Sequence, residues 1–406
     1  MGYERSREKP FVIRRWDRDV TILPQKHLND MRSIPNTKLN AQIIAAINQA
    51  HEYTGLTFII NNNLLFRSLN KLTADLPKYI DSSMGVLDWA MPLEFPQSIE
   101  WTEVTIERAT RLLLKKLPSW FRPLVARMLP RLQKLRESQV VSAELVAPIL
   151  ERWKSGISTP EDKDTLLYWM LEHAQEHERT AVEMSYRVNF AILASVHATS
   201  MTLTSIIFNL CAHPEYFDIL RDEIAQTKKE LGSMGEAGPE TLQKQFLAKL
   251  EKMDSFIAET LRLHQPLLYS PTRFAMEDIT LKDGTHIPKG TWVGFPSTNI
   301  MADPAFYPNP EVFDGLRNYK KRQESPGVGN KYLAAQPSTS DLSFGYGNRA
   351  CPGRFFAVSA LKMVLTKILS EYDIKYADTR NPYNDKEEFS FVSMDTKLML
   401  KKKEFI

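Results

Sequence analysis

The sequence has very few cysteines, and this scarcity excludes several kinds of site. Its 406 residues include only Cys211 and Cys351, too few for a zinc or iron–sulfur site built from four cysteines. The two could form one disulfide, although a large chain with so few cysteines is more typical of a reducing compartment. A site that depends on cysteine therefore has to use one thiol at a time.

The sequence also lacks a strong charge bias, an internal repeat and a dinucleotide-binding fingerprint. The formal net charge is +3, so the composition does not point to nucleic acid. No Gly-x-Gly-x-x-Gly motif lies on a strand–helix turn, so electrons for a redox reaction would come from another protein. The segment Met1 to Pro10 is charged and has no apolar core, so we predict no signal peptide or spanning helix there.

What is present is an ordinary globular composition, with 43% hydrophobic and 25% charged residues. Length alone suggests two or three domains, but large single-domain enzymes are a known exception. No stretch has the character of a domain boundary. We therefore predict one domain over residues 1–406.

The spacing of apolar residues predicts mostly helices, with a few short strands near the start and end. Residues 10 to 35 are expected to form two short strands and a helix from about His27, as part of a small sheet. A final strand is expected from Leu398 to Lys403. The predicted helices further along the chain are Trp101 to Lys116, Leu124 to Leu135, Val141 to Trp153, Met184 to Ala212, Glu215 to Leu231 and Leu247 to His264.

The most informative stretch is a glycine-rich loop, Phe344 to Gly353, that precedes an amphipathic helix. A cysteine thiolate is one of the few protein ligands that haem iron accepts axially, and Cys351 is suited to that role. Gly345 and Gly347 allow positive φ and a close approach to a flat macrocycle. We interpret this stretch as a haem-thiolate loop.

Neighbouring residues of the loop fit the same interpretation. Arg349 offers a fork of donors suited to a haem propionate. Pro352 suits the first position of a helix, whose backbone donors would then face the sulfur. Phe344 is expected to cover the sulfur from solvent. The alternative is a glycine loop around a buried structural cysteine.

These residues resemble the signature of the cytochrome P450 family, Phe-x-x-Gly-x-Arg-x-Cys-x-Gly. The five fixed positions are filled by Phe344, Gly347, Arg349, Cys351 and Gly353. The resemblance implies a mainly α fold with a small β region, and haem b (iron protoporphyrin IX) ligated by Cys351. It covers the chain from about residue 10 to the C-terminus.

The long apolar helix from Met184 to Ala212 resembles the central helix of the family, which crosses the distal haem face. Thr199 matches the family's threonine, while His197 stands at the usual acid position and Ala198 where a second threonine is common. The resemblance implies that Thr199, with Ser200 and His197, manages protons at the site. Hydroxyl groups here can bond back to helix carbonyls and bend or open the helix. The middle of this helix is too polar to predict a membrane span. The alternative is ordinary Ser/Thr helix packing.

Two further clusters match the family by position. Glu259 and Arg262 share one helical face, and Arg317 is the matching third partner. A carboxylate shared by two guanidiniums would fix an irregular segment, 318 to 343, beneath the haem loop. An ordinary surface ion pair is the alternative. Arg67 or Lys71 is expected to reach a haem propionate, with a solvated basic helix face as the alternative.

The function implied by the resemblance is monooxygenation of a lipophilic small molecule, terpenoid-like and made in fungal secondary metabolism. The electron donor would be an NADPH-cytochrome reductase. A basic docking face is expected from Arg349, Arg354, Lys320, Lys321 and Arg322. By family resemblance the protein would work at the cytoplasmic side of the endoplasmic reticulum, with room for peripheral membrane contact but no transmembrane segment in this chain.

The chain departs from the family in two places. We do not expect this chain to contain the membrane anchor and proline hinge with which eukaryotic relatives usually begin. The stretch between Trp101 and Leu117 is abridged, because relatives carry further helices there that help roof the pocket. Two other functions therefore stay open: a haem-thiolate isomerase or dehydratase that needs no reductase, and a non-catalytic haem-binding remnant.

Overall fold

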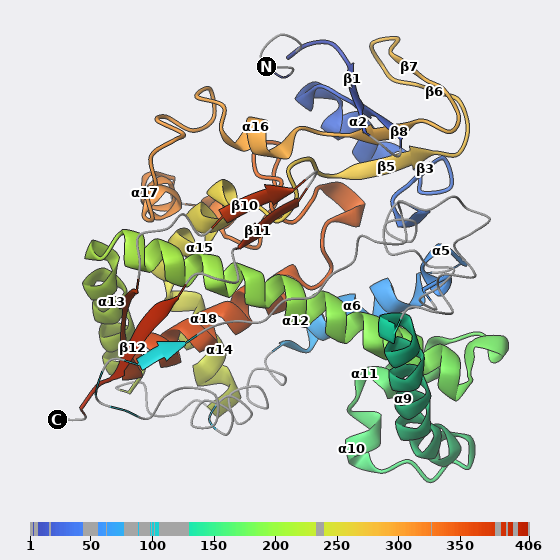
Figure 1. The fold of residues 1–406 in the computed structure, drawn as a ribbon, viewed down its shortest axis with the longest axis horizontal. Coiled ribbons are helices and arrows are strands. Elements are labelled where there is room, and N and C mark those ends of the chain that lie inside the picture. Colours follow the sequence, from blue (N-terminus) through green and yellow to red (C-terminus); the bar gives the residue numbers. More distant parts are fainter. Residues whose placement is uncertain are drawn as a thin grey trace.

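The computed structural model describes most of the chain in separate ranges. These are residues 3, 7–15, 18–43, 56–61, 63–76, 88, 98, 100, 102–104, 130–232, 239–325, 327–377, 383–386, 389–392 and 397–404. Within them, a helical body carries small sheets at two of its edges (Figure 1).

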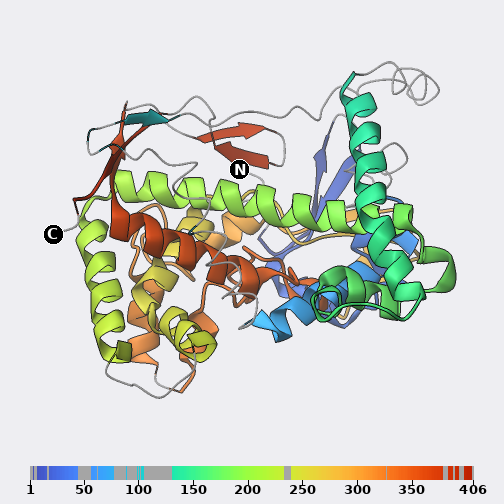
Figure 2. The same cartoon turned by 90° about the horizontal axis from the view of Figure 1, so that it is seen from below.

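The helical body is organised around α12 (Ala181–Ala212), which runs the length of the molecule beside α18 (Arg354–Glu371) (Figure 2). Its other long helices are α9 (Pro130–Lys154), α13 (Glu215–Gly232), α14 (Pro239–Lys249) and α15 (Glu251–Leu263). The shorter helices are α2 (Leu28–Ser33), α5 (Phe58–Asn61), α6 (Leu64–Ala74), α10 (Pro160–Lys163), α11 (Leu166–His173), α16 (Ser297–Met301) and α17 (Arg317–Glu324). The 3-10 turns in the described ranges are η1 (Gln25–His27), η3 (Glu176–Glu178), η4 (Gly329–Tyr332) and η5 (Gly347–Arg349).

Among the described residues, the largest sheet has five strands in the order β1-β2-β8-β5-β3, of which β2 and β8 pair in parallel and the other neighbours antiparallel. Its strands are β1 (Phe11–Arg14), β2 (Asp19–Ile22), β8 (Trp292–Gly294), β5 (Thr272–Ala275) and β3 (Leu39–Asn40). A three-stranded sheet contains β4 (Thr102–Val104), β12 (Leu398–Lys402) and β9 (Tyr372–Tyr376). Two small hairpins are β6 (Ile279–Thr280) with β7 (His286–Ile287), and β10 (Tyr383–Lys386) with β11 (Phe389–Val392).

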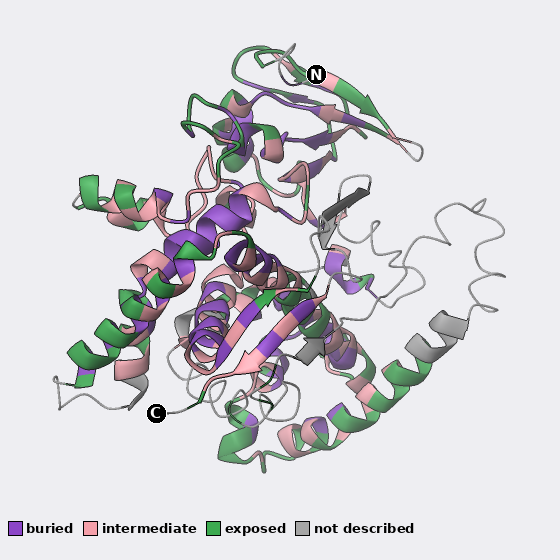
Figure 3. Ribbon diagram, turned by 60° about the vertical axis from the view of Figure 1, so that its left-hand side comes forward, coloured by how far each residue is buried: buried purple, intermediate pink, exposed green. Residues whose placement is uncertain are grey.

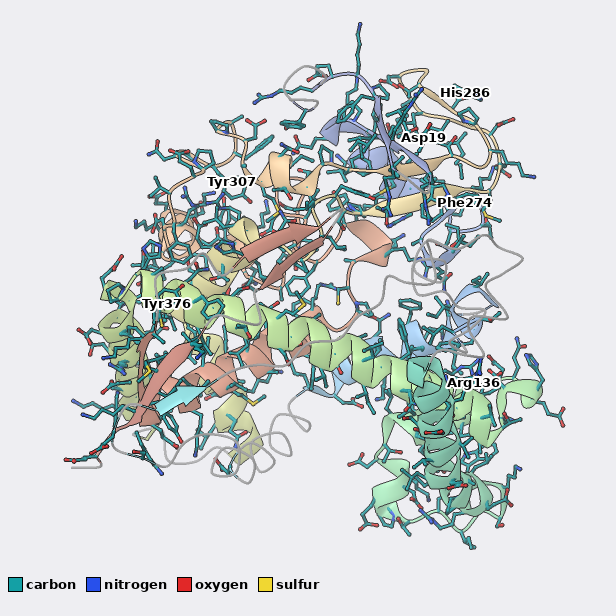
Figure 4. The ribbon with its side chains drawn as sticks, viewed as in Figure 1. Asp19, Arg136, Phe274, His286, Tyr307 and Tyr376 are labelled. Carbon is teal, nitrogen blue, oxygen red and sulfur yellow. The ribbon has the colours of Figure 1, made fainter. Side chains whose placement is uncertain are left out.

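The main core lies between α12, α13, α15 and α18, where apolar faces meet. Leu210, Leu220, Phe256 and Leu365 are completely buried there. Buried residues are concentrated in these helices, whereas the outer side of α9 is largely exposed (Figure 3). At the far end, the Tyr376 hydroxyl donates to the Phe208 carbonyl at 2.8 Å and ties β9 to α12 (Figure 4).

Several sequence predictions are confirmed by these elements. The two early strands followed by a helix appear as β1, β2, η1 and α2, and the long apolar helix is α12. The predicted helix Glu215 to Leu231 and the final strand are also present, as α13 and β12.

Other boundaries were predicted wrongly. The expected helix from Trp101 to Lys116 contains strand β4, which pairs with the distant β12, and its remaining residues lie outside the described ranges. The helices expected at Leu124 to Leu135 and Val141 to Trp153 are one helix, α9, in their described part. The helix expected at Leu247 to His264 is divided, because α14 ends at Lys249 and Leu250 precedes α15.

Among the described residues, α12 is long and apolar enough to cross a membrane by length and composition. The prediction that the middle of this helix is too polar to span a membrane is therefore wrong by length and composition. Its contacts are with α9, α15 and α18, which is the packing of a central helix.

Candidate functional site

The glycine loop before α18 is held by its own backbone. The Cys351 N–H donates to the Phe344 carbonyl at 2.8 Å, and the Gly345 N–H donates to the Leu342 carbonyl at 2.9 Å. Gly345 and Gly347 have φ values of +74° and +72°, which side chains with a Cβ rarely adopt. The predicted need for glycine at both positions is thus confirmed.

Helix α2 supports this loop from outside. A Cβ on Gly347 would lie 3.0 Å from Cγ of Arg32, so glycine is also needed for the close approach. The Tyr346 hydroxyl donates to Oδ1 of Asn29 at 2.8 Å. The loop conformation is therefore fixed by contacts on both sides of the chain.

Cys351 is a free cysteine with an exposed side chain at the end of this loop. Desolvation by the surrounding protein raises the pKa of its thiol, while the Gly353 N–H and the Arg354 charge act in the opposite direction. A backbone N–H near the start of the helix, that of Gly353, faces the sulfur as expected. The helix does not begin at Pro352, as the sequence predicted. Helix α18 begins at Arg354 with Gly353 as its N-cap, so Pro352 lies in the preceding turn.

Phe344 lies at the beginning of the loop, and its side chain is half-buried and packs against the main core cluster. The ring therefore anchors the beginning of the loop to the helical core. Its expected role in covering the sulfur remains a prediction.

The sequence analysis missed a second arginine, Arg273, whose pKa is affected by the charge of Arg349. Arg273 on β5 is 7% exposed, and its guanidinium donates to the Thr272 carbonyl at 2.8 Å. Burial and the nearby Arg349 charge lower the pKa of Arg273 to about 10. Among the described residues, no carboxylate ion pair joins either guanidinium.

Two neighbouring cations without a carboxylate are a donor set suited to a dianion. Haem carries two propionates, and Arg forks are suited to binding carboxylates. The residues present therefore fit haem, with Cys351 for the iron and the Arg273–Arg349 pair for the propionates. A buried arginine in a short strand carries no local motif, which is why the sequence analysis passed over it.

The middle of α12 has free hydroxyl groups beside bonded ones. Ser195, Thr202 and Thr204 each donate back to a helix carbonyl, at 3.1, 3.0 and 2.8 Å. The helix remains continuous, so the expected opening of its hydrogen-bond ladder is not seen. Thr199 is half-buried and Ser200 exposed, and neither hydroxyl has a partner among the described residues.

The other predicted residues near the site have mixed outcomes. The side chain of His197 lies outside the described part of the structure. Arg67 on α6 is exposed, and its guanidinium lies 5.9 Å from the centre of the Trp169 ring. Lys71 pairs with Asp75 at 2.9 Å. The propionate role of Arg67 therefore remains a prediction, and Lys71 is already paired.

The predicted three-residue ion-pair cluster is confirmed. The Arg262 guanidinium donates to both Glu259 oxygens at 2.8 and 2.9 Å, and Arg317 Nε donates to the same carboxylate at 3.1 Å. All three residues are buried, so the surface-pair alternative is excluded. The segment after Arg317 is less irregular than expected, because its first residues form α17.

The predicted docking cations are mostly engaged within the protein. Lys320 pairs with Asp314, and Arg322 pairs with Glu251 while its side chain is 12% exposed. The Lys321 ammonium lies 4.9 Å from the centre of the Tyr307 ring (Figure 4). Arg322 was therefore wrongly assigned to a free basic face.

Comparisons with known proteins agree with this geometry. The family model of cytochrome P450 matches residues 90–402. Cytochrome P450 monooxygenase ATR4 of Stachybotrys chlorohalonatus is 35% identical, and the alignment covers 94% of this chain and 80% of ATR4. Cytochrome P450 monooxygenase sdnB of Sordaria araneosa is 31% identical, with 99% and 82% covered.

More distant similarities extend the range of relatives. Ent-kaurene oxidase P450-4 of Gibberella fujikuroi is 28% identical, and the alignment covers 93% of this chain and 81% of that protein. The fold is similar to that of the retinoic-acid-bound cyanobacterial CYP120A1, with a TM-score of 0.67, 18% identity, and 99% and 94% covered. The ATR4 alignment spans 424 residues, more than the 406 of this chain, so ATR4 contains positions without a counterpart here.

Proposed function

Because the chain belongs to the cytochrome P450 family, we propose that it is a haem-thiolate monooxygenase acting on a lipophilic, terpenoid-like molecule in fungal secondary metabolism. The names of ATR4, sdnB and ent-kaurene oxidase support the activity, and the last supports the terpenoid class. The whole chain, 1–406, would serve as one haem domain.

In this proposal haem b, when bound, activates O2 for insertion of one oxygen atom into a C–H bond. Cys351 would hold the iron, and Arg349 and Arg273 would hold the propionates. Gly345, Gly347 and Gly353 would let the backbone come close to the bound group. The observation that supports this arrangement is the free thiol at the end of a loop that Phe344, Tyr346 and Gly347 fix from both sides.

The distal residues would manage protons and the substrate. Thr199 and Ser200 have hydroxyls without partners in the described chain, so each can hold a water molecule or pass on a proton. His197, two residues before Thr199, is proposed as a further proton donor. The exposed apolar residues of the same helix, Ile192 and Val196, would favour a lipophilic substrate.

The electron donor would be an NADPH-cytochrome reductase, reached at the cytoplasmic side of the endoplasmic reticulum with peripheral membrane contact. The Lys320 side chain is 58% exposed, compared with 12% for Arg322, although Lys320 pairs with Asp314. A docking acid on the reductase would have to compete with Asp314 for this ammonium group.

The test is the absorption spectrum of the reduced, carbon-monoxide-bound protein, recorded beside Cys351→Ala and the matched Cys211→Ala. We expect a red-shifted Soret band in the wild type and in Cys211→Ala, and none in Cys351→Ala. If the wild type lacks the band, the monooxygenase proposal fails. A band with substrate turnover in the absence of NADPH would instead indicate an isomerase or dehydratase. A band without substrate-dependent NADPH consumption would indicate a non-catalytic remnant.

A further inference from the structure

Arg354, the first residue of α18, is bound to the ligand residue itself. Its Nη1 donates to the Cys351 carbonyl oxygen at 2.8 Å, and its backbone N–H points to the same oxygen at 3.5 Å. Two donors of one residue therefore meet on the carbonyl of the cysteine that would hold the iron. Such a contact fixes the orientation of the residue that carries the thiolate.

The side chain of Arg354 also lies against the neighbouring ring of Phe355. Its guanidinium lies 4.6 Å from the centre of the Phe355 ring, a distance at which a cation is attracted to the ring face. Its Nε is enclosed by protein and has no hydrogen-bond partner among the described residues. The ring contact keeps the guanidinium near the loop, whereas the enclosed donor costs free energy because it has exchanged water for no partner.

The charge of Arg354 is also uncompensated within the described chain. Lys320 and Arg322, which the sequence grouped with it, pair with Asp314 and Glu251. Arg354 makes no carboxylate ion pair there. Its charge consequently lies one hydrogen bond, 2.8 Å, from the carbonyl oxygen of the residue that carries the thiol.

We propose that Arg354 is a positioning residue that sets the reduction potential of the bound iron, by drawing electron density from the Cys351 thiolate. This inference rests on the proposed haem-thiolate function. A fixed positive charge stabilises the centre more strongly after it has gained an electron, so it raises the potential. Hydrogen bonds and charges around a ligating sulfur are an established means by which proteins tune iron.

The experiment is a dye-mediated redox titration of the purified haem proteins, in which a chemical reductant supplies the one electron and no reductase is present. Arg354→Gln can still donate to a carbonyl but has no charge. At a fixed applied potential we expect its ratio of ferrous to ferric protein to fall about fivefold, or about 40 mV at 59 mV per tenfold change. Arg354→Lys should shift less than half as far, and the matched surface variant Lys320→Gln should not shift.

A wild-type potential in Arg354→Gln would overturn the inference. An unchanged potential with a raised KM for the reductase would do the same, because it would identify Arg354 as a docking residue. If Arg354→Gln takes up no haem, the neutral variant Arg354→Met carries the test, and a potential equal to the wild type overturns the inference. A wild type without the carbon-monoxide band would instead remove the proposed function on which it rests.

Discussion

The two sides of the candidate site are built in different ways. On the cysteine side, Leu365 of α18 is fully buried, and the Glu259 carboxylate is shared by two guanidiniums. On the α12 side, Val196 is 59% exposed and the Thr199 hydroxyl has no partner in the described chain. The cysteine side is part of the protein core, whereas the middle of α12 presents groups that are free to meet a ligand.

This difference separates stability from function. Substitution of a core residue lowers the free energy of unfolding, and the site is lost because the protein unfolds. A residue on the exposed face of α12 can change without unfolding the protein, so its effects are expected in turnover. Matched substitutions on the two sides distinguish these outcomes.

The largest expected effect is from Glu259→Ala, which leaves two buried guanidiniums without their carboxylate. Breaking one partner of a buried ion pair costs about 3–5 kcal/mol, so we expect the variant to unfold at much lower urea and to lose haem. The control is Glu251→Ala, whose carboxylate is 35% exposed and pairs with Arg322. Exposed pairs contribute up to about 1 kcal/mol, so equal losses in the two variants would contradict the structural role of Glu259.

A second pair of substitutions compares the two sides directly. Leu365→Ala leaves a cavity in the core and should lower the free energy of unfolding by about 2–5 kcal/mol. Val196→Ala removes an exposed side chain and should change it by less than about 0.5 kcal/mol. Urea unfolding of both variants gives the answer. A large loss in Val196→Ala would show that this face of α12 is covered in solution.

A smaller effect is expected from Arg273→Gln, which removes one of the two cations proposed to bind propionates. A hydrogen bond to a charged group contributes about 1.5–3 kcal/mol, so haem should leave roughly 10- to 100-fold faster. Transfer of haem to excess apomyoglobin measures that rate. Arg14→Gln, which removes an exposed arginine on β1, is the control and should match the wild type. An Arg273→Gln rate equal to the wild type would remove Arg273 from the haem site.

On the α12 side, Thr199→Ala is expected to leave stability unchanged and to lower the yield of product per NADPH consumed. One hydrogen bond contributes about 1 kcal/mol, which corresponds to roughly a fivefold loss of coupling. Thr202→Ala is the matched control, because its hydroxyl already donates to the Ala198 carbonyl at 3.0 Å. If both variants lose coupling equally, the free hydroxyl of Thr199 has no special role.

Sequence analysis succeeded where the signal is local. The cysteine loop could be predicted because its glycines, arginine and cysteine lie within ten residues and each has a chemical reason to be there. The Glu259–Arg262 pair follows from helical spacing. Only the family resemblance added Arg317, which is distant in sequence but donates to the same carboxylate.

The failures are of the opposite kind. Strand β4 was predicted as helix because its partner β12 lies almost 300 residues away, and no local pattern encodes that pairing. Arg273 was missed because it lies in a short strand without a local motif, and only the fold brings it within range of the Arg349 charge. Pro352 was placed at the helix start by propensity, whereas the turn at the end of the cysteine loop delays the helix to Arg354.

The smallest expected effect is a pH dependence from Glu223 on the cysteine side. Its carboxylate accepts from the Met253 N–H at the start of α15, and burial raises its pKa above the ordinary value of 4.5. The folded state then holds a proton that the unfolded state has released, so stability falls as pH rises through the window above 4.5. Glu223→Gln should flatten this slope when urea midpoints are measured from about pH 4 to 7.

Glu230 is the control, because hydrogen bonds from Lys249 and Gln226 lower its pKa. Glu230→Gln therefore removes a contribution of the opposite sign. An unchanged slope in Glu223→Gln would show that its carboxylate is as well solvated when folded as when unfolded.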